Sequence, residues 1–560
     1  MSNQSLRVIA LGLLLAASVF SQESVTIRVN AAESVGAYKP ISGYFGYDEA
    51  NFTYAKNGQK LIGELGKLGG PVCVRTHFML TTGDGAAGYK WGSTNAYTED
   101  AAGKPVYDWT IVDRIIDTYI KAGTKPFLEV GFTPQALSSH PDPYKPDWKP
   151  GDNFNQYYLG WAYPPKDYAK WGELVSQWAK HEVAKYGRAE VESWYWEIWN
   201  EPDIAYWHGT PAEYDQLYDY AVDAIKRVLP TARVGGPAST GPNATRAAAF
   251  LKQFLEHCDT GKNYATGATG APLDFISYHA KGQPQVVEGH VRMGISKNTA
   301  DAGVGMQIVA SFAKFRNLPI IISESDPEGC AACSARVYPQ NAYRNGPLYA
   351  SYEAVMMKNM FELADREKTN IAGMLTWAFE FEGQPYFEGF RTLASNGIDK
   401  PVLNVFRMAA RMHGDRVKLE SSGAVPVATI QASGVRGATP DVDGMAVSSA
   451  RGLSVLLWNY HDDDLPGPDA PVQVKLSGLP AAAKRITLHH YRIDETHSNA
   501  WTAWKNMGSP QEPTPDQYKA LEAAGQLQEL KPVSTIPGGK EVNLDLSLPR
   551  QGISLLQLTW

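Results

Sequence analysis

The chain lacks three features that mark particular classes of protein: a long hydrophobic run after its first residues, a cluster of basic residues, and a repeated or low-complexity tract. No segment after residue 21 approaches about 18 uninterrupted apolar residues, so we expect no membrane anchor. With a net charge of −7 and no run of lysine and arginine, nucleic acid is not an expected partner. At 560 residues, 44% of them hydrophobic, the chain is long enough for two or three globular domains.

Cysteine is scarce, with only four in the chain, and two of these form a CxxC pair. In an oxidising compartment Cys330 and Cys333 have the spacing of a small disulfide loop; a redox motif and half of a zinc site are the alternatives. Neither a second CxxC nor a paired histidine spacing accompanies them, so no metal site is predicted. We expect this pair to shape the loop that follows Glu324.

The first residues are typical of a secretory signal. Arg7 supplies a positive start, residues 8–17 an apolar core, and residues 19–21 a small-residue cleavage site. We therefore expect residues 1–21 to be a signal peptide and the protein to be exported, either periplasmic or secreted.

The segment from Trp194 to Pro202 reads WYWEIWNEP and is the most informative stretch of the chain. Bulky residues on both faces favour a strand buried on both sides, and polar residues at the C-terminal end of such a strand face the mouth of a β/α barrel. Asn200 and Glu201 occupy that end. Glu197 lies about 13 Å deeper at ~3.3 Å per residue, so we expect it not to serve the same site.

A second apolar run, from Leu318 to Ile322, is followed by Ser323 and Glu324. Two carboxylates on one rim of a barrel are what glycoside hydrolysis requires. One protonates the leaving oxygen, and the other attacks the anomeric carbon or activates water.

Strand-like and helical segments alternate over residues 41–413, which predicts βα units and an α/β fold, a (β/α)8 TIM barrel. We expect two long, aromatic-rich insertions to form the walls of a cleft over the barrel mouth: Thr81–Tyr107 and Ser138–Pro165. Trp91, Trp148 and Trp161 within them are candidates either for stacking on a sugar or for anchoring the loops. The eight predicted strands end near Gly46, His77, Gly131, Glu201, Gly236, His279, Glu324 and Phe379.

The pattern changes near residue 414, where short alternating runs separated by turn residues predict a C-terminal β-sandwich over residues 414–560. Residues 22–40 contain one more alternating strand, Val25–Val29, which we expect to pair with the sandwich. We expect the sandwich to have a structural role.

Six ordered stretches make the chain similar to glycoside hydrolase family 39, and specifically to its bacterial β-xylosidase-like branch; α-L-iduronidase is in the same family. The resemblance covers residues 25–415 well and the remainder loosely. The stretches are residues 43–49, 74–77, 194–202, 274–279, 323–324 and 376–379.

The resemblance implies a retaining mechanism, with Glu201 as a general acid/base that starts protonated and Glu324 as the nucleophile. It implies no metal and no organic cofactor, because two carboxylates carry the chemistry. Asn200 is expected to bind the 2-hydroxyl of the sugar, and Trp377 to be the platform below the ring.

Further substrate contacts are expected from residues at other strand ends. His77 resembles a family histidine that contacts a ring hydroxyl. Of Tyr278 and His279, one is expected to hold the nucleophile or a hydroxyl, with His279 preferred. Glu382, or its neighbour Glu380, is expected to bind an outer hydroxyl.

We therefore expect an exo-acting β-xylosidase that releases xylose from xylo-oligosaccharides. Residues 379–384 and 326–330 depart from the better-known members, so an arabinoside, a glucoside or a uronide is an alternative substrate. A uronide requires a cation near its carboxylate; Arg75 and Arg391 are candidates, although Arg75 is expected to brace the barrel interior. A non-catalytic carbohydrate-binding protein is the other alternative, but binding alone does not require an acid and a nucleophile.

Overall fold

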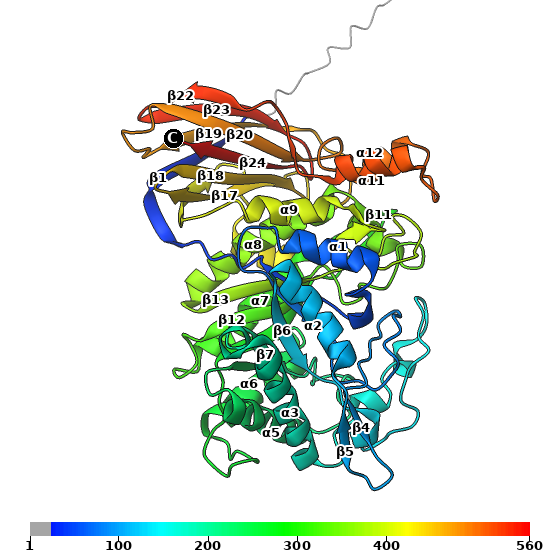
Figure 1. Ribbon diagram of the computed structural model, residues 1–560. Coiled ribbons are helices and arrows are strands. Elements are labelled where there is room, and N and C mark those ends of the chain that lie inside the picture. Colours follow the sequence, from blue (N-terminus) through cyan, green and yellow to red (C-terminus); the bar gives the residue numbers. More distant parts are fainter. Residues whose placement is uncertain (1–23) are drawn as a thin grey trace, which may run out of the picture.

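The computed structural model describes residues 24–560, so the predicted signal peptide, residues 1–21, lies outside the described residues. The described chain forms a barrel with a sheet domain stacked on it (Figure 1). No helix within residues 24–560 combines the length and apolar character needed to cross a membrane.

Eight parallel strands close into the barrel in the order β12-β13-β2-β3-β6-β7-β8-β9. All eight predicted strands are present, and the predicted (β/α)8 fold is confirmed. Their bounds are β2 (Tyr44–Tyr47), β3 (Cys73–Thr76), β6 (Lys125–Val130), β7 (Tyr195–Ile198), β8 (Arg233–Ser239), β9 (Phe275–Lys281), β12 (Pro319–Asp326) and β13 (Asn370–Trp377).

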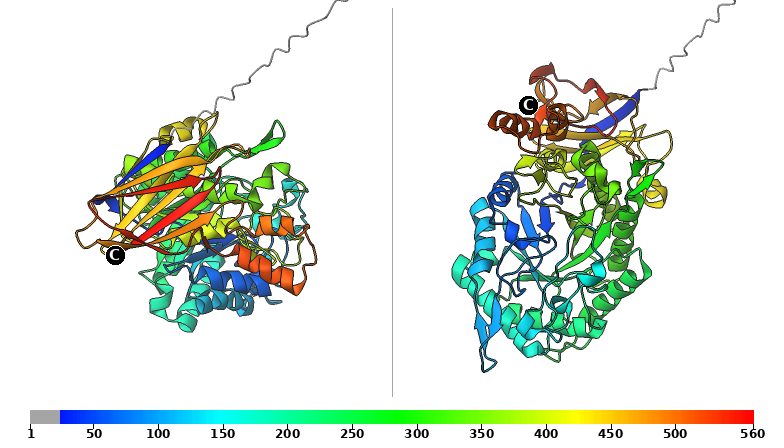
Figure 2. Two further views of the ribbon diagram at one scale, coloured as in Figure 1. Left: turned by 90° about the horizontal axis from the view of Figure 1, so that it is seen from above. Right: turned by 90° about the vertical axis from the view of Figure 1, so that its right-hand side faces the viewer.

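Helices form an outer ring around the strands, as the right-hand view of Figure 2 shows. Local sequence sets their ends. At the start of α5, Thr210 and Glu213 form a capping box with Pro211 in the first turn. Gly123 ends α2 with a φ of 80°, which a residue without Cβ adopts at little cost. The helices are α1 (Lys56–Leu65), α2 (Thr110–Ala122), α3 (Tyr168–Tyr186), α4 (Arg188–Val191), α5 (Pro211–Val228), α6 (Thr245–Thr260), α7 (Ile295–Ala310), α8 (Pro347–Glu367) and α9 (Pro401–Ala409).

The long insertions after β3 and β6 are held by their own aromatic side chains. Trp161 is fully buried and donates its indole N–H to the backbone oxygen of Tyr157, while Trp148 donates to that of Asp152. Trp91 is 3% exposed. Of the two roles open for these tryptophans, the structure therefore favours loop anchoring over sugar stacking.

The C-terminal strands form one hydrogen-bonded sheet of ten strands. The N-terminal strand β1 belongs to it, because it pairs antiparallel with β16 and parallel with β19. A C-terminal sheet domain is thus present, as predicted, but its strands join into one hydrogen-bonded sheet rather than the two separate sheets expected of a β-sandwich. The strands are β1 (Val25–Ala37), β16 (Asp415–Ser421), β17 (Asp441–Ser449), β18 (Gly452–Tyr460), β19 (Ala470–Ser477), β20 (Arg485–Ile493), β21 (Gln528–Glu529), β22 (Ser534–Pro537), β23 (Glu541–Leu548) and β24 (Ile553–Thr559).

Side-chain alternation along β18 joins the two parts of the molecule. Leu453, Val455 and Leu457 enter the core of the sheet domain, whereas Leu456 and Trp458 enter the large core that contains the barrel. Two short helices between β20 and β21, α11 (Ala500–Asn506) and α12 (Pro515–Gly525), add a further apolar contact to the barrel loop that follows β13. The domain limits drawn from the sequence stay predictions.

Candidate active site

The ends of several barrel strands bring polar and aromatic side chains into one cleft of about 550 Å³. Five of the residues predicted for the site line it. They are His77 after β3, Asn200 and Glu201 after β7, Glu324 in β12 and Trp377 at the end of β13.

The two predicted catalytic carboxylates face each other across this cleft. Glu201, Glu324 and His279 present oxygen and nitrogen atoms that all lie within 4.8 Å of one another. His279 Nδ1 is 2.9 Å from Glu201 Oε1 and 3.8 Å from Glu324 Oε2. Carboxyl groups separated by about 5 Å suit retaining hydrolysis, because inversion needs about 6.5–9.5 Å to admit a water.

An abrupt end to β7 gives Glu201 its position. Trp199 and Glu201 have φ values of 72° and 44°, so the chain leaves the extended conformation directly after Ile198. The turn is fixed on both sides, since Glu201 N donates to Ala238 O at 2.9 Å and Ile204 N donates to Glu201 O at 3.1 Å. Left-handed backbone at two bulky residues carries a conformational cost, and such outliers cluster at functional sites.

Glu324 is surrounded by cationic groups. Its Oε2 accepts from Lys281 Nζ at 2.7 Å and its Oε1 from Arg75 Nη1 at 3.3 Å. Burial alone raises the pKa of Glu324, but His279, Lys281 and Arg75 outweigh it and hold the pKa well below its ordinary 4.5. Glu324 is therefore ionised near neutral pH, as a nucleophile must be.

Arg75 connects the barrel interior to the cleft. The fully buried guanidinium contacts Glu197 and Glu129 below the site and Asn200 Oδ1, at 2.9 Å, within it. Glu197 does not line the cleft, as expected, yet it supports the site through Arg75. The expected bracing role of Arg75 agrees with these contacts.

Comparison with known proteins assigns the family. The sequence profile described as glycosyl hydrolases family 39 matches residues 86–541. The chain belongs to this family.

Relatives of this family 39 chain include enzymes with different substrates. It is 28% identical over 444 residues to a beta-xylosidase of Caldicellulosiruptor saccharolyticus, covering 78% of this chain and 80% of the relative. It is 26% identical over 398 residues to the alpha-L-iduronidase of Homo sapiens, covering 66% of this chain and 57% of the relative.

Solved structures share the fold. A monomeric beta-xylosidase from Caulobacter crescentus CB15 superposes with a TM-score of 0.73 at 21% sequence identity, covering 95% of this chain and 99% of that one.

Side-chain alternation along β9 separates the two residues that the sequence left as alternatives. His279 points to the carboxylates of Glu201 and Glu324, whereas Tyr278 points to the helical layer and donates its hydroxyl to Ala302 O in α7 at 2.8 Å. The prediction of Tyr278 as a substrate contact is wrong for this reason. Lys281, two residues after His279 and on the same face, lines the cleft instead.

Glu382 does not reach the cleft of this family 39 chain. Its Oε1 accepts from Asn57 N in the first turn of α1, where unpaired backbone N–H groups favour a carboxylate. The prediction of a sugar contact at Glu382 is therefore wrong. Glu380 accepts from Gly397 N, and burial raises its pKa to about 8.

The disulfide predicted as one possibility is present between Cys330 and Cys333. Both cysteines line the cleft, and Arg344 donates to the backbone oxygen of Cys330 at 2.6 Å. The loop after the nucleophile strand thus forms a braced wall of the site, as the sequence suggested.

Sequence reasoning missed other residues that line the cleft because they come from loops. In the second insertion, Phe154 and Tyr158 line the cleft and the tryptophans do not. Asp48 also lines the cleft, and its carboxylate lies 3.1 Å from His77 Nε2. Burial, with the charge of Arg75, holds the pKa of His77 well below 6.5, so its imidazole is neutral.

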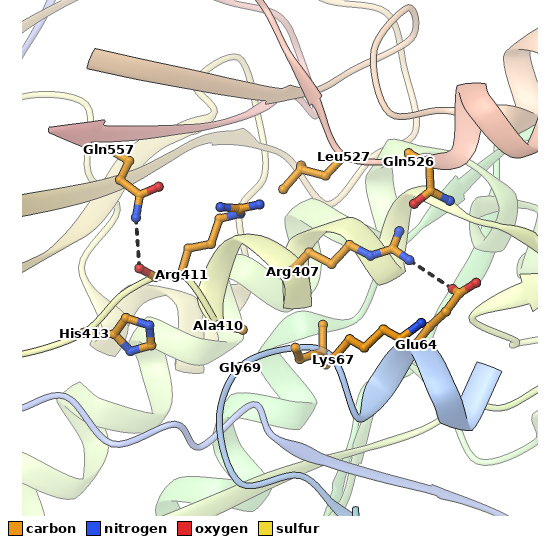
Figure 3. Close-up of a pocket in the computed structure, with 11 residues that line it drawn as sticks. Glu64, Lys67, Gly69, Arg407, Ala410, Arg411, His413, Gln526, Leu527 and Gln557 are labelled. Carbon is orange, nitrogen blue, oxygen red and sulfur yellow. Dashed lines mark hydrogen bonds and ion pairs between the residues drawn. The ribbon is translucent and has the colours of Figure 1, made fainter. Parts of the chain in front are cut away.

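A larger cavity, of about 680 Å³, lies between α1, α9 and the sheet domain (Figure 3). Its lining includes Lys67, Arg407 and Arg411 but only one carboxylate, Glu64, which pairs with Arg407 at 3.0 Å. Without a facing pair of carboxylates, this cavity does not meet the requirement for glycoside hydrolysis.

Replacing Arg75 with methionine should lower the stability of the barrel by about 3–5 kcal/mol, because Glu129 and Glu197 would then be buried without their counter-ion. Chemical denaturation followed by tryptophan fluorescence measures this. Arg336→Met is the matched control, since Arg336 pairs with Glu388 at the surface and its loss should leave the transition unchanged. Equal midpoints for the two variants would contradict the bracing role.

Replacing Lys281 with methionine should move the acidic limb of the pH profile of kcat/KM to higher pH by about one unit or more. The sign follows because Glu324 reacts as the carboxylate, and removing a cation at 2.7 Å raises the pKa of Glu324. Lys297→Met is the control: Lys297 also lines the cleft but pairs with Asp301. An unmoved limb in Lys281→Met would show that Lys281 does not set the ionisation of Glu324.

Proposed function

We propose that this chain is an exported, retaining exo-glycosidase that releases xylose from short β-linked chains. The observation that carries this proposal is the facing pair of Glu201 and Glu324, with oxygens within 4.8 Å of each other. Similarity to beta-xylosidases over more than three quarters of the chain supports xylose as the sugar.

The reaction follows from the two environments. Glu324, ionised and 6% exposed, attacks the anomeric carbon while Glu201, at 16% exposure, protonates the leaving oxygen. Water then enters on the side of Glu201, which takes its proton and releases the sugar from Glu324. His279 Nδ1 lies within hydrogen-bonding distance of Glu201 and orients it.

Two neighbours are placed to bind the sugar. Arg75 donates a hydrogen bond to Asn200 Oδ1, so the amide N–H groups of Asn200 remain available to donate to a sugar hydroxyl. Trp377 lines the cleft, and its position is fixed by His77, whose ring centroid is 4.4 Å away.

A second candidate substrate is a uronide. Three lysines line the cleft: Lys90, Lys281 and Lys297. Lys90 and Lys281 pair with cleft carboxylates, whereas Lys297 is 42% exposed and pairs with Asp301 outside the cleft lining. The two arginines considered from the sequence are unsuitable, because Arg75 is enclosed and Arg391 is buried against Glu328.

Hydrolysis of a panel of aryl glycosides tests these assignments. The panel contains the β-xyloside, the α-L-arabinoside, the β-glucoside and the α-L-iduronide, and we expect the β-xyloside to give the highest kcat/KM. A preference for the iduronide that is lost in Lys297→Met would favour the second candidate. Tight oligosaccharide binding without turnover of any glycoside would indicate a non-catalytic binding protein.

A further inference from the structure

We propose that a groove beside the catalytic cleft binds the leaving-group side of the substrate, as a site for the neutral saccharide units that follow the scissile bond. The groove has a volume of about 600 Å³ and is lined by the segment directly after Glu201 and by the start of α6. This inference rests on the proposed function, because a leaving-group saccharide exists only if the cleft cleaves a glycosidic bond.

The groove adjoins the cleft. Ile204 lines both the cleft and the groove. Its backbone N–H donates to Glu201 O at 3.1 Å, so a single turn holds the proposed acid/base, Glu201, and the residue shared by the two cavities. The helices α5 and α6 begin at the end of the barrel where β7 and β8 finish, so the groove lies at the catalytic end of the barrel.

Reaction chemistry gives the direction in which the substrate runs. Glu201 delivers its proton to the oxygen of the leaving group, so the leaving group must extend past Glu201. The groove begins at the residues that follow Glu201 in the chain, Pro202, Asp203 and Ile204. A chain of sugars leaving the cleft on this side meets the groove next.

The lining of the groove suits a neutral sugar. Part of its lining is apolar: Trp207 and Phe250 are 4% and 7% exposed, and the indole N–H of Trp207 donates to Thr210 O at 3.0 Å. Sugar rings present apolar C–H faces that pack on such surfaces, and their hydroxyls need polar groups at the edge.

Arg246 provides that polar edge. Its side chain is 61% exposed. Its Nε and Nη2 reach Asp203 at 3.4 Å, and Nη2 also donates to Thr240 Oγ1 at 3.3 Å, which leaves Nη1 available to donate to sugar hydroxyls. Because Asp203 balances the charge of Arg246, the groove offers no excess positive charge to an acidic sugar.

Filling the groove tests the proposal. Ala249 is exposed on α6 and lines the groove, so Ala249→Trp occupies it without touching the cleft. We expect kcat/KM on xylotriose and xylotetraose to fall about tenfold, whereas kcat/KM on p-nitrophenyl β-xyloside stays within about twofold. Ala520→Trp is the matched control, because Ala520 is exposed on α12 and away from the groove, and it should behave as the wild type.

Arg246→Met provides an independent variant that removes a hydrogen-bond donor without adding bulk, and it should lower kcat/KM on the longer chains about threefold. Thermal melting of each variant shows that it is folded. The proposal is overturned if the wild type shows no gain in kcat/KM from xylobiose to xylotetraose, or if Ala249→Trp lowers the rates on long and aryl substrates equally. Absence of wild-type turnover on every aryl glycoside would be a different result, since it removes the proposed function itself.

Discussion

We expect the exchange of Glu324 for glutamine to lower kcat on the best glycoside by about 10⁴-fold or more, the scale of loss when a covalent nucleophile is removed. The amide has nearly the shape of the carboxylate, so the cleft keeps its geometry while the attacking charge disappears. Lys281 and Arg75, which hold the pKa of Glu324 low, would then face a neutral group.

The matched control for this variant is Glu382→Gln. Glu382 follows another barrel strand and was itself predicted to bind substrate, but its carboxylate bonds Asn57 N away from the cleft. Its kcat should stay close to that of the wild type. Retained turnover in Glu324→Gln, or a comparable loss in Glu382→Gln, would remove Glu324 from its assigned role.

We expect the exchange of Glu201 for alanine to lower kcat on xylobiose by about 10²–10⁴-fold, the usual contribution of a general acid. The loss on p-nitrophenyl β-xyloside should be smaller for glycosylation, because that leaving group departs without a proton. Added azide should enter the space beside His279, attack the sugar held on Glu324 and form a glycosyl azide of retained configuration.

Glu288→Ala is the control for Glu201→Ala, since Glu288 is exposed in the turn between β10 (Gln285–Val287) and β11 (His290–Arg292) and is not part of the cleft lining. It should keep wild-type rates on both substrates and show no response to azide. Equal losses on both substrates in Glu201→Ala, without rescue by azide, would show that Glu201 is not the acid/base.

The barrel and its carboxylate pair were predictable because both depend on local pattern. An apolar run that is bulky on both faces indicates a buried parallel strand. A polar residue at its C-terminal end is expected at the catalytic rim of the barrel. Glu201 and Glu324 satisfy that pattern in the sequence, and the closed barrel brings them together.

The errors at Tyr278 and Lys281 have one cause. Side chains alternate across a strand, so choosing His279 for the cleft assigns Lys281 to it and excludes Tyr278. The sequence contained this signal. Its use would have identified the lysine that contacts the nucleophile at 2.7 Å.

Loop residues could not be placed in the same way. Glu382 bonds the start of α1, more than 300 residues earlier in the chain, and Trp161 serves its own loop. Such positions depend on contacts between distant segments, which no local pattern reports. Pairing of β1 with the C-terminal domain was predicted, but its position between β16 and β19 was not, because strand order also depends on contacts between distant segments.

The anomeric configuration of the first product tests the central claim most directly. Proton NMR during the first turnovers of p-nitrophenyl β-xyloside, before mutarotation, distinguishes the two anomers of the released sugar. Double displacement through Glu324 predicts that β-xylose appears first and the α-anomer only later. Initial release of α-xylose would mean a single displacement by water, and would contradict the assignment of Glu324 as a nucleophile despite its closeness to Glu201.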